Sequence, residues 1–261
     1  FRRRDLRQID AVIHCAGAAH GAANSAAGRA LNARAPVTAA RAALEAGCRH
    51  VVFISTAAVY GASPGDVPLT EQSARRPTDA SARDQAAAED ALDALTRDAG
   101  AALTNVRPPM IYGRAAPGNF RLLSGAARRG IPLPARTRTV LRSVVAVDNL
   151  TAFLAHLIQR PEAAAGVFLP TDLPGISVAD FYGALAHAYG RPARLLPVPG
   201  WTLAAARGVP GLGPQLGKVL TPFRMDPSAG YARLAWQPPY NTLNALTDGP
   251  ETAVGSAAPA T

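Results

Sequence analysis

The chain has 261 residues, of which 48% are hydrophobic and 17% charged, so it can bury the core of one large domain or of two unequal lobes. No apolar run reaches the ~18 residues of a membrane-spanning helix, which predicts a soluble protein with no membrane partner. Cys15 and Cys48 are the two cysteines, too few for a disulfide framework or a cysteine metal cage. We therefore predict no metal site and a reducing, cytoplasmic location.

The formal net charge is +9, and Lys218 is the single lysine beside many arginines. The arginines are scattered, with one tight run at residues 2–4. Neither a zinc-finger spacing nor an aromatic–basic stripe of an RNA-binding sheet is present in the sequence. We therefore expect no nucleic-acid partner and favour an anionic small molecule as the ligand.

Strand and helix signals alternate through the first half of the chain. Short apolar or β-branched runs predict buried strands at residues 10–14, 50–55 and 101–106. Helical periodicity at residues 29–46 ends at Gly47, and a second helix begins after Thr78 or Asp79, runs to about Arg97 and is closed by Gly100. This β–α–β–α–β order predicts an α/β protein with a doubly wound parallel sheet.

Ligands of such sheets bind beyond the carboxyl ends of the strands, which here are residues 14–18, 55–61 and 107–113. From about residue 114 the sequence holds more loops and prolines, which indicates a smaller α/β lobe. We expect a sheet domain over residues 1–113, mainly a substrate lobe over 114–246 and a disordered tail over 247–261.

Short motifs stand in a fixed order at and after these strand ends. They are VIHCAG at 12–17, Asn32, VFISTAAVYG at 52–61, Thr70 and Glu71 before Pro77, RPPMIYG at 107–113, GNF at 118–120, LRSVVAVDNL at 141–150 and LAWQP at 234–238. Together they resemble the extended short-chain dehydrogenase/reductase superfamily, and most closely its branch of NAD-dependent epimerases and dehydratases that act on nucleotide sugars. The resemblance implies a Rossmann-like fold and covers about residues 5–240.

The resemblance also implies site residues. It places NAD beside His14, Ala16, Gly17, Asn32, Ser55 and Pro109. It places a nucleotide sugar beside Asn119 and Arg142, and assigns Thr56 a hydrogen bond to the reacting sugar. Small side chains let the backbone approach a flat cofactor, and a guanidinium matches phosphate oxygens.

Each of these residues also has a plain structural interpretation. Ser55 and Thr56 could form a local cap at the end of a strand, and His14 fits a buried structural histidine better than an acid or base. Arg142 on its own would be a solvated surface charge. The structure has to separate these alternatives.

One departure from the family concerns the acid–base pair. Family members carry Tyr-x-x-x-Lys on one helix, so that the ammonium lowers the pKa of the phenol and the tyrosinate accepts a proton from the sugar hydroxyl. The matching places hold Ser81 and Gln85, and no tyrosine lies between Tyr60 and Tyr112. Arg83 has a charge, but an offset of two residues puts it on another face of the helix. Whether this chain is an active enzyme is therefore open.

The second departure concerns the front of the chain. The family opens with a strand, a glycine-rich turn and a helix that holds the pyrophosphate, and this sequence begins after that unit. We expect a sheet that is incomplete at the N-terminus, with an apolar edge that a partner or a rearranged N-terminus covers unless the sequence is a fragment. We also expect weak NAD binding, and no rescue by restored Tyr and Lys unless that unit is supplied.

The sequence thus favours an NAD-dependent epimerase/dehydratase-type protein that acts on nucleotide sugars and is catalytically impaired. The alternative is a non-catalytic relative, a pseudoenzyme that binds a nucleotide-sugar-like ligand or a protein partner. A reductase of the same superfamily would also need the tyrosine, so Ser81 counts against it equally. A homodimer is a further possibility.

Overall fold

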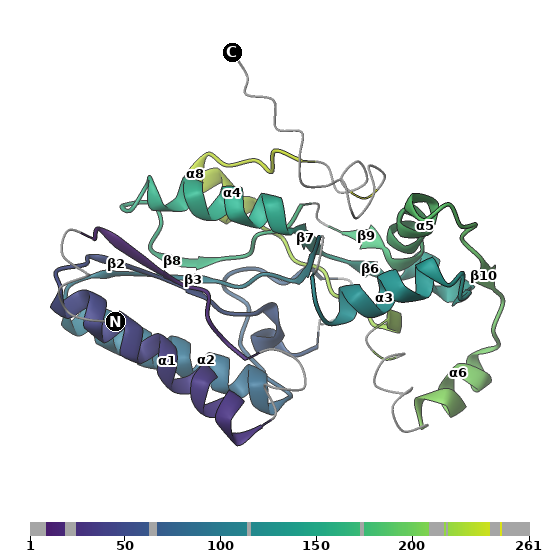
Figure 1. Ribbon diagram of the computed structural model, residues 1–261, viewed down its shortest axis with the longest axis horizontal. Coiled ribbons are helices and arrows are strands. Elements are labelled where there is room, and N and C mark those ends of the chain that lie inside the picture. The colour runs from purple at the N-terminus through teal and green to yellow at the C-terminus, as the bar shows by residue number, and fades with distance from the viewer. Residues whose placement is uncertain are drawn as a thin grey trace, which may run out of the picture.

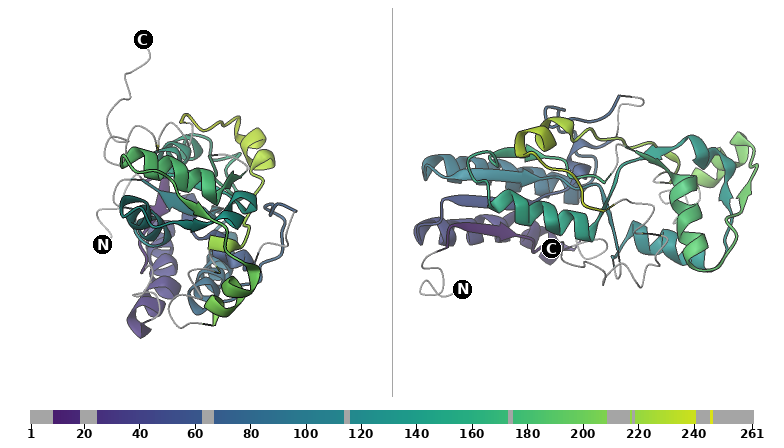
Figure 2. Two further views of the ribbon diagram at one scale, coloured as in Figure 1. Left: turned by 90° about the vertical axis from the view of Figure 1, so that its right-hand side faces the viewer. Right: turned by 90° about the horizontal axis from the view of Figure 1, so that it is seen from above.

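The computed structural model describes residues 9–18, 25–62, 67–113, 116–172, 175–208, 217, 219–240 and 246. The protein is elongated, with a sheet and its helices at one end and a smaller mixed part at the other (Figures 1 and 2). The tail predicted over residues 247–261 lies outside the described residues, as does the arginine run at residues 2–4.

The main sheet is fully parallel, with the strand order β1-β2-β3-β8. Its strands are β1 (Ala11–His14), β2 (His50–Ile54), β3 (Ala102–Val106) and β8 (Gly166–Phe168). The first three are the predicted strands, so the predicted α/β class is confirmed. The strand β8 was not predicted, and it joins the sheet beside β3 from far along the chain.

Helices cover both faces of this sheet (Figure 1). The helices α1 (Ala26–Glu45) and α2 (Ala80–Asp98) lie on one face, and α4 (Val147–Ile158) and α8 (Ser228–Leu234) lie on the other. Alternate residues of β2 point to opposite faces: Val51 and Phe53 pack toward α1 and α2, and Val52 packs toward α4. Because both faces are covered, the strand is apolar throughout, as its sequence indicated.

Capping residues set the helix bounds. Ser25 Oγ accepts from the N–H of Gly28 at 3.0 Å, so α1 begins three residues before the predicted start at residue 29. Asp79 caps α2 by accepting from the N–H of Ala82 at 2.8 Å, which selects it over Thr78. Gly47 follows α1 with φ +98°, a backbone conformation that favours glycine.

The smaller part is built from short strand pairs and three helices. The pairs are β4 (Met110–Tyr112) with β7 (Val144–Ala146), β5 (Leu133–Pro134) with β10 (Leu195–Leu196), and β6 (Leu141–Arg142) with β9 (Ile176–Ser177). The helices described there are α3 (Asn119–Arg128), α5 (Val178–Ala188) and α6 (Gly200–Arg207), together with the short 3-10 turn η4 (Ala135–Thr139). Another 3-10 turn, η3 (Ala57–Tyr60), follows β2.

Aromatic packing forms the core of this smaller part. The rings of Tyr112 and Phe181 meet edge to face at 5.4 Å, and Phe120 lies 6.1 Å from Tyr112. The chain after residue 113 does not stay in this part, because α4 and β8 return to the main sheet. Within the described ranges, no helix is both long and apolar enough to cross a membrane.

His50 is a buried polar residue at the start of β2, with 2% of its surface exposed. Its Nε2 lies 2.8 Å from the hydroxyl of Thr104, and that hydroxyl donates to the carbonyl of Ala164. The hydroxyl therefore accepts from His50, which places the ring proton on Nε2. Burial lowers the pKa of His50, so the folded chain favours the neutral ring.

We predict that the free energy of unfolding falls as the pH drops below about 6.5, where an unfolded histidine begins to bind a proton that folded His50 resists. The slope approaches about 1.4 kcal/mol per pH unit for one such group. Urea unfolding at pH 5 to 8 measures it. His50→Gln should flatten the slope, while His187→Gln on the exposed surface of α5 should leave it unchanged. Parallel slopes for the wild type and His50→Gln would contradict this account.

Candidate functional site

The carboxyl ends of the main-sheet strands meet at one edge, as the sequence predicted. The N–H of Ser55 donates to the carbonyl of Val106 at 2.8 Å, which extends the pairing of β2 and β3 by one residue. The N–H of Ala57 donates to Pro108 at 3.0 Å, and the N–H of Arg107 donates to Phe168 at 2.9 Å. These bonds bring segments 55–61 and 107–113 together beside the end of β8.

The loop after β1 is held by Asn32 of α1. The Asn32 side chain is 1% exposed, and its Oδ1 accepts from the N–H of Ala18 at 2.7 Å while its Nδ2 donates to the Ala18 carbonyl at 3.0 Å. A Cβ on Gly17 would lie 3.1 Å from Asn32 Oδ1, so glycine suits this close approach. Asn32 therefore positions the loop, while the exposed Ala16 and Gly17 present their backbone at the edge.

Among the buried polar atoms without a hydrogen-bond partner in the described part of the chain are those of two predicted site residues at this edge. Ser55 is 6% exposed and its Oγ is one of them. The other is Nε2 of the half-buried His14. Burial lowers the pKa of His14 against the opposing effect of a backbone hydrogen bond at Ala16, so its ring favours the neutral form. An orphaned donor or acceptor at a strand end is open to a ligand.

The neighbouring residues follow the plainer interpretation in part. Thr56 caps η3, because its Oγ1 accepts from the N–H of Ala58 at 3.2 Å. Thr56 and Pro109, which lies just before β4, are both half-buried. The cap fixes the direction of the Thr56 hydroxyl and leaves that hydroxyl a proton to donate.

Ser81 and Gln85 lie where the helix prediction placed them, in the first turns of α2. Both are half-buried, and Gln85 Oε1 is buried without a partner among the described residues. Arg83 is exposed and donates to the carbonyl of Thr78 at 3.2 Å, on another side of the helix. No group in this stretch reproduces a tyrosine beside a lysine.

Asp84 is a residue that the sequence interpretation missed. It follows Ser81 by three positions, a spacing that puts both on one side of α2. One carboxylate oxygen, Oδ2, is buried and has no hydrogen-bond partner in the described part of the chain. The spacing alone could have singled out this carboxylate.

A buried ion pair ties α2 to the end of β3. Arg107 donates to both carboxylate oxygens of Glu89, from Nε to Oε1 at 3.0 Å and from Nη2 to Oε2 at 2.5 Å. Its Nη1 donates to the hydroxyl of Tyr60 at 2.8 Å, and Arg75 reaches Glu89 Oε2 at 3.2 Å. Burial alone would lower the pKa of Arg107, but its bonds to Glu89 raise it overall.

The same network keeps Tyr60 protonated. Burial raises its pKa, and the positive charge of Arg107 only partly opposes this. The phenol is 1% exposed and sits below the end of β2. It therefore serves as a fixed hydrogen-bond partner of Arg107.

The predicted substrate residues lie in the smaller part of the protein. Asn119 is exposed at the first position of α3. Arg142 is half-buried, with Nη1 donating to the carbonyl of Thr221 at 2.6 Å and its guanidinium 5.7 Å from the ring of Phe223. Burial lowers the pKa of Arg142 to about 10, which leaves it charged at neutral pH. It is therefore not the freely solvated charge of the plain interpretation.

Asp172 joins the two parts and was also missed. Its carboxylate accepts from the hydroxyl of Tyr112 at 2.7 Å, from the N–H of Ala146 at 2.9 and 3.0 Å, and from Asn149 Nδ2 at 2.7 Å. Asn149 in turn bonds both backbone groups of Tyr240. A polar residue shortly after an unpredicted strand carried no sequence signal.

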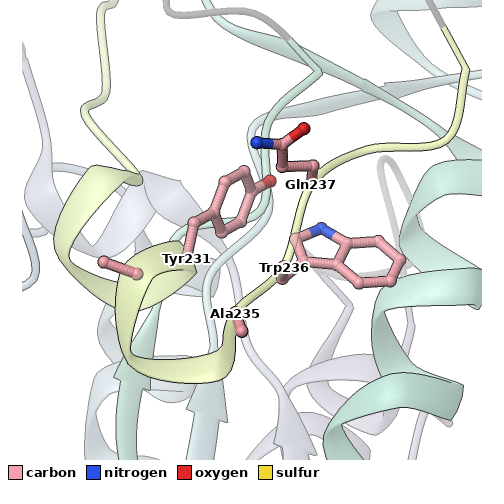
Figure 3. Close-up of a pocket in the computed structure, with 5 residues that line it drawn as sticks. Tyr231, Ala235, Trp236 and Gln237 are labelled. Carbon is pink, nitrogen blue, oxygen red and sulfur yellow. The ribbon is translucent and has the colours of Figure 1, made fainter.

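A hollow beside α8 is lined by Tyr231, Ala232, Ala235, Trp236 and Gln237 (Figure 3). None of the predicted site residues lines it. Among the residues that the structure covers, no three His, Cys, Asp or Glu side chains gather in a way that could hold a metal ion. The carboxyl edge therefore remains the candidate site.

A parallel sheet covered on both faces, with small and polar residues at its carboxyl edge, defines a Rossmann-like α/β protein. Residues 3–168 match the family model described as the NAD dependent epimerase/dehydratase family. The chain belongs to this family.

Individual relatives agree with this assignment. A UDP-glucose 4-epimerase of Vibrio cholerae is 30% identical over 241 residues, which cover 90% of this chain and 74% of that protein. The fold is similar to a Thermus thermophilus UDP-glucose 4-epimerase in complex with NAD, at a TM-score of 0.74 and 20% identity over 98% of this chain and 81% of that one. It is also similar to a Thermotoga maritima UDP-glucose 4-epimerase with UDP-glucose, at a TM-score of 0.70 and 18% identity. This similarity covers 96% of this chain and 79% of that one.

We predict that Glu89→Gln lowers the free energy of unfolding by about 3–5 kcal/mol, because it leaves the buried guanidinium of Arg107 without its counter-charge. Asp93→Asn is the matched control: it breaks the exposed pair of Asp93 with Arg97 in the same helix and should cost less than about 1 kcal/mol. Urea unfolding of both variants measures the difference. Equal losses would show that the buried pair has no special weight.

Proposed function

We propose that this chain binds NAD and a nucleotide sugar in the manner of an epimerase or dehydratase and turns the sugar over only slowly. The observation that carries the proposal is the pair Ser81 and Gln85, half-buried on α2 within an otherwise family-like site. Residues up to 113 would form the cofactor-binding site, and residues after 113 would form most of the substrate-binding site. Free thiols at Cys15 and Cys48 are compatible with a cytoplasmic location.

The carboxyl edge suits a dinucleotide. The exposed backbone of Ala16 and Gly17 leaves room for a flat ring, and the orphaned groups of Ser55 and His14 are open to hydrogen bonds. Pro109 adds an apolar surface at the end of β3. Bound there, NAD would supply a hydride acceptor. Support comes from the family and from the Thermus relative in complex with NAD.

The smaller part suits the diphosphate of a nucleotide sugar. Arg142 keeps its positive charge near the junction and is held in place by Thr221 and Phe223. Asn119 adds an exposed amide at the start of α3. The Thermotoga relative with UDP-glucose and the Vibrio UDP-glucose 4-epimerase support a uridine nucleotide as the first ligand to test.

The proton-transfer machinery is what this site lacks. Removing hydride from a sugar carbon requires a base for the hydroxyl proton, and a positioned base contributes about 10²–10⁴-fold. Ser81 has no adjacent cation to lower its pKa, Gln85 is neutral, and Thr56 can only hold the sugar by a hydrogen bond. Asp84 is a carboxylate three residues after Ser81, and Asp79, the other one nearby, is the N-cap of α2.

The second candidate is a non-catalytic relative that binds a nucleotide-sugar-like ligand or a protein partner, with a second copy of the chain as one such partner. The orphaned oxygen of Gln85 favours it, because an unpaired buried acceptor does no proton transfer. Tight ligand binding together with turnover at the level of the uncatalysed reaction would select this candidate.

We predict that the chain turns over UDP-glucose or dTDP-glucose with NAD at a rate about 10²–10⁴-fold below ordinary enzyme rates. In a version that begins with a glycine-rich strand–turn–helix unit, Ser81→Tyr with Gln85→Lys should raise product formation by a similar factor. The matched control, Arg83→Tyr with Ala87→Lys, has the same spacing on the exposed side of α2 and should give no gain.

Ordinary turnover by the unmodified chain would refute the proposal. Asp84→Asn would then show whether that carboxylate is the base. Equal gains in both double variants would show that position on the helix does not matter.

We predict that Arg142→Gln weakens UDP binding about 10–100-fold, the range expected for losing a charged hydrogen bond. Arg138→Gln removes the same charge from an exposed position four residues earlier and should change the affinity by less than about threefold. Titration calorimetry measures both. Similar affinities for the two variants would remove Arg142 from the binding site.

A further inference from the structure

The positive charge of the chain is divided unevenly between its two parts. The sequence from 116 to 142 contains no Asp or Glu, and neither does the sequence from 181 to 225. The helix α2 of the sheet part, by contrast, carries five acidic residues: Asp84, Glu89, Asp90, Asp93 and Asp98. A general excess of arginine in the chain would add bases to both parts and would not remove acids from one of them.

Seven exposed arginines of the smaller part lie on neighbouring elements. Two are on α3, one directly follows it, two are on η4 and two connect α5 to β10; they are Arg121, Arg128, Arg129, Arg136, Arg138, Arg191 and Arg194. Both α3 and η4 pack against α5, and β10 pairs with β5 next to them. Figures 1 and 2 show α3, α5 and β10 at the same end of the molecule. We call these seven residues the cationic tip.

The helix α3 shows how the tip is arranged. Phe120 and Ala127 are buried, whereas Arg121 and Arg128, each one residue further along, and the C-cap residue Arg129 are exposed. The acid nearest in sequence to Arg191 and Arg194 is Asp180, which already accepts from the hydroxyl of Ser177 at 2.6 Å. The charge of the arginines is therefore largely uncompensated within the smaller part.

Large apolar side chains are exposed among these arginines. Leu122 is 55% exposed on α3, Ile131 is 48% exposed just after Arg129, and Leu196 is 48% exposed in β10. Trp201, five residues beyond Leu196, is 74% exposed. Exposed apolar side chains mixed with cationic ones are suited to an interface where an anionic layer covers an apolar one.

We propose that the cationic tip binds an anionic lipid surface and holds the protein at the periphery of a membrane. Phospholipid headgroups would pair with the arginines while Leu122, Ile131 and Leu196 enter the acyl boundary. The sequence predicted no membrane partner because it has no membrane-spanning run, but peripheral binding does not need one.

A nucleic acid fits this surface less well. Base stacking needs exposed aromatic rings beside the arginines. Tyr189 is the aromatic residue next to α3, and it is half-buried with its hydroxyl 2.7 Å from Ser124. Trp201 on α6 is an exposed ring, but the exposed apolar side chains of α3 and β10 and at residue 131 are aliphatic, which favours lipid.

The test is sedimentation of the protein with vesicles of phosphatidylcholine alone and of phosphatidylcholine mixed with phosphatidylglycerol. We expect binding to the mixed vesicles only, with weakening as NaCl rises. Arg121→Gln, Arg128→Gln and Arg129→Gln together should lower the partition coefficient about 100-fold, because each arginine near an anionic surface contributes about a factor of five. The thermal unfolding midpoint of this variant should stay close to that of the wild type.

The matched control removes three exposed arginines from α1: Arg29→Gln, Arg34→Gln and Arg41→Gln. It has the same net charge as the tip variant and should lose less than about threefold in partition. Equal loss in both triple variants would mean that net charge alone matters and would overturn the proposal. Binding to heparin or RNA without binding to the mixed vesicles would overturn it too, as would equal binding to uncharged vesicles.

Discussion

The ion pair between Arg107 and Glu89 is the interaction on which the rest of the site depends. It joins the end of β3 to the middle of α2 and also holds the hydroxyl of Tyr60 at the end of β2. The backbone N–H of Arg107 binds the end of β8 as well. One residue thus sets the spacing of three strand ends and one helix, and a buried charge of this kind is stable only while its partners stay in place.

This anchoring does not involve the residues at the places of the family's acid–base pair. Ser81 and Gln85 lie on the same helix as Glu89, but neither takes part in the pairing that positions α2. Different residues at these two places therefore leave the ion pair that positions α2 intact. Binding surfaces at the sheet edge and at Arg142 can remain while the proton-transfer pair changes.

The sequence predicted the elements whose signals are local. The β-branched run at residues 50–55 and the periodic helix after Asp79 have their causes within a few residues, and both predictions are confirmed. The strand β8 has three residues and gains its stability from pairing with β3, so no local pattern marked it. Asp172 was missed for the same reason, because its partners lie 23 to 60 residues away.

The site and the surface were predictable to different degrees. The order of the motifs singled out Ser55 and Arg142 as candidate residues. Only the structure could show that the side-chain amide of Asn32 is hydrogen-bonded to Ala18 and that Thr56 caps η3. The arginines appeared scattered along the sequence because seven of them meet only after folding. The sequence signal for the cationic tip is the absence of Asp and Glu from residues 116–142 and 181–225. The net charge of the whole chain does not show this local absence.

The carboxylate of Asp172 also has a consequence for the ligand. It lies at the N-terminus of α4, where it accepts from the N–H of Ala146. The negative charge of Asp172 therefore already compensates the positive end of that helix dipole. A phosphate that approached α4 would meet repulsion rather than attraction. In the proposed complex, the diphosphate of a nucleotide would therefore depend on the charge of Arg142 rather than on the N-terminus of α4, and its affinity would fall as the salt concentration rises.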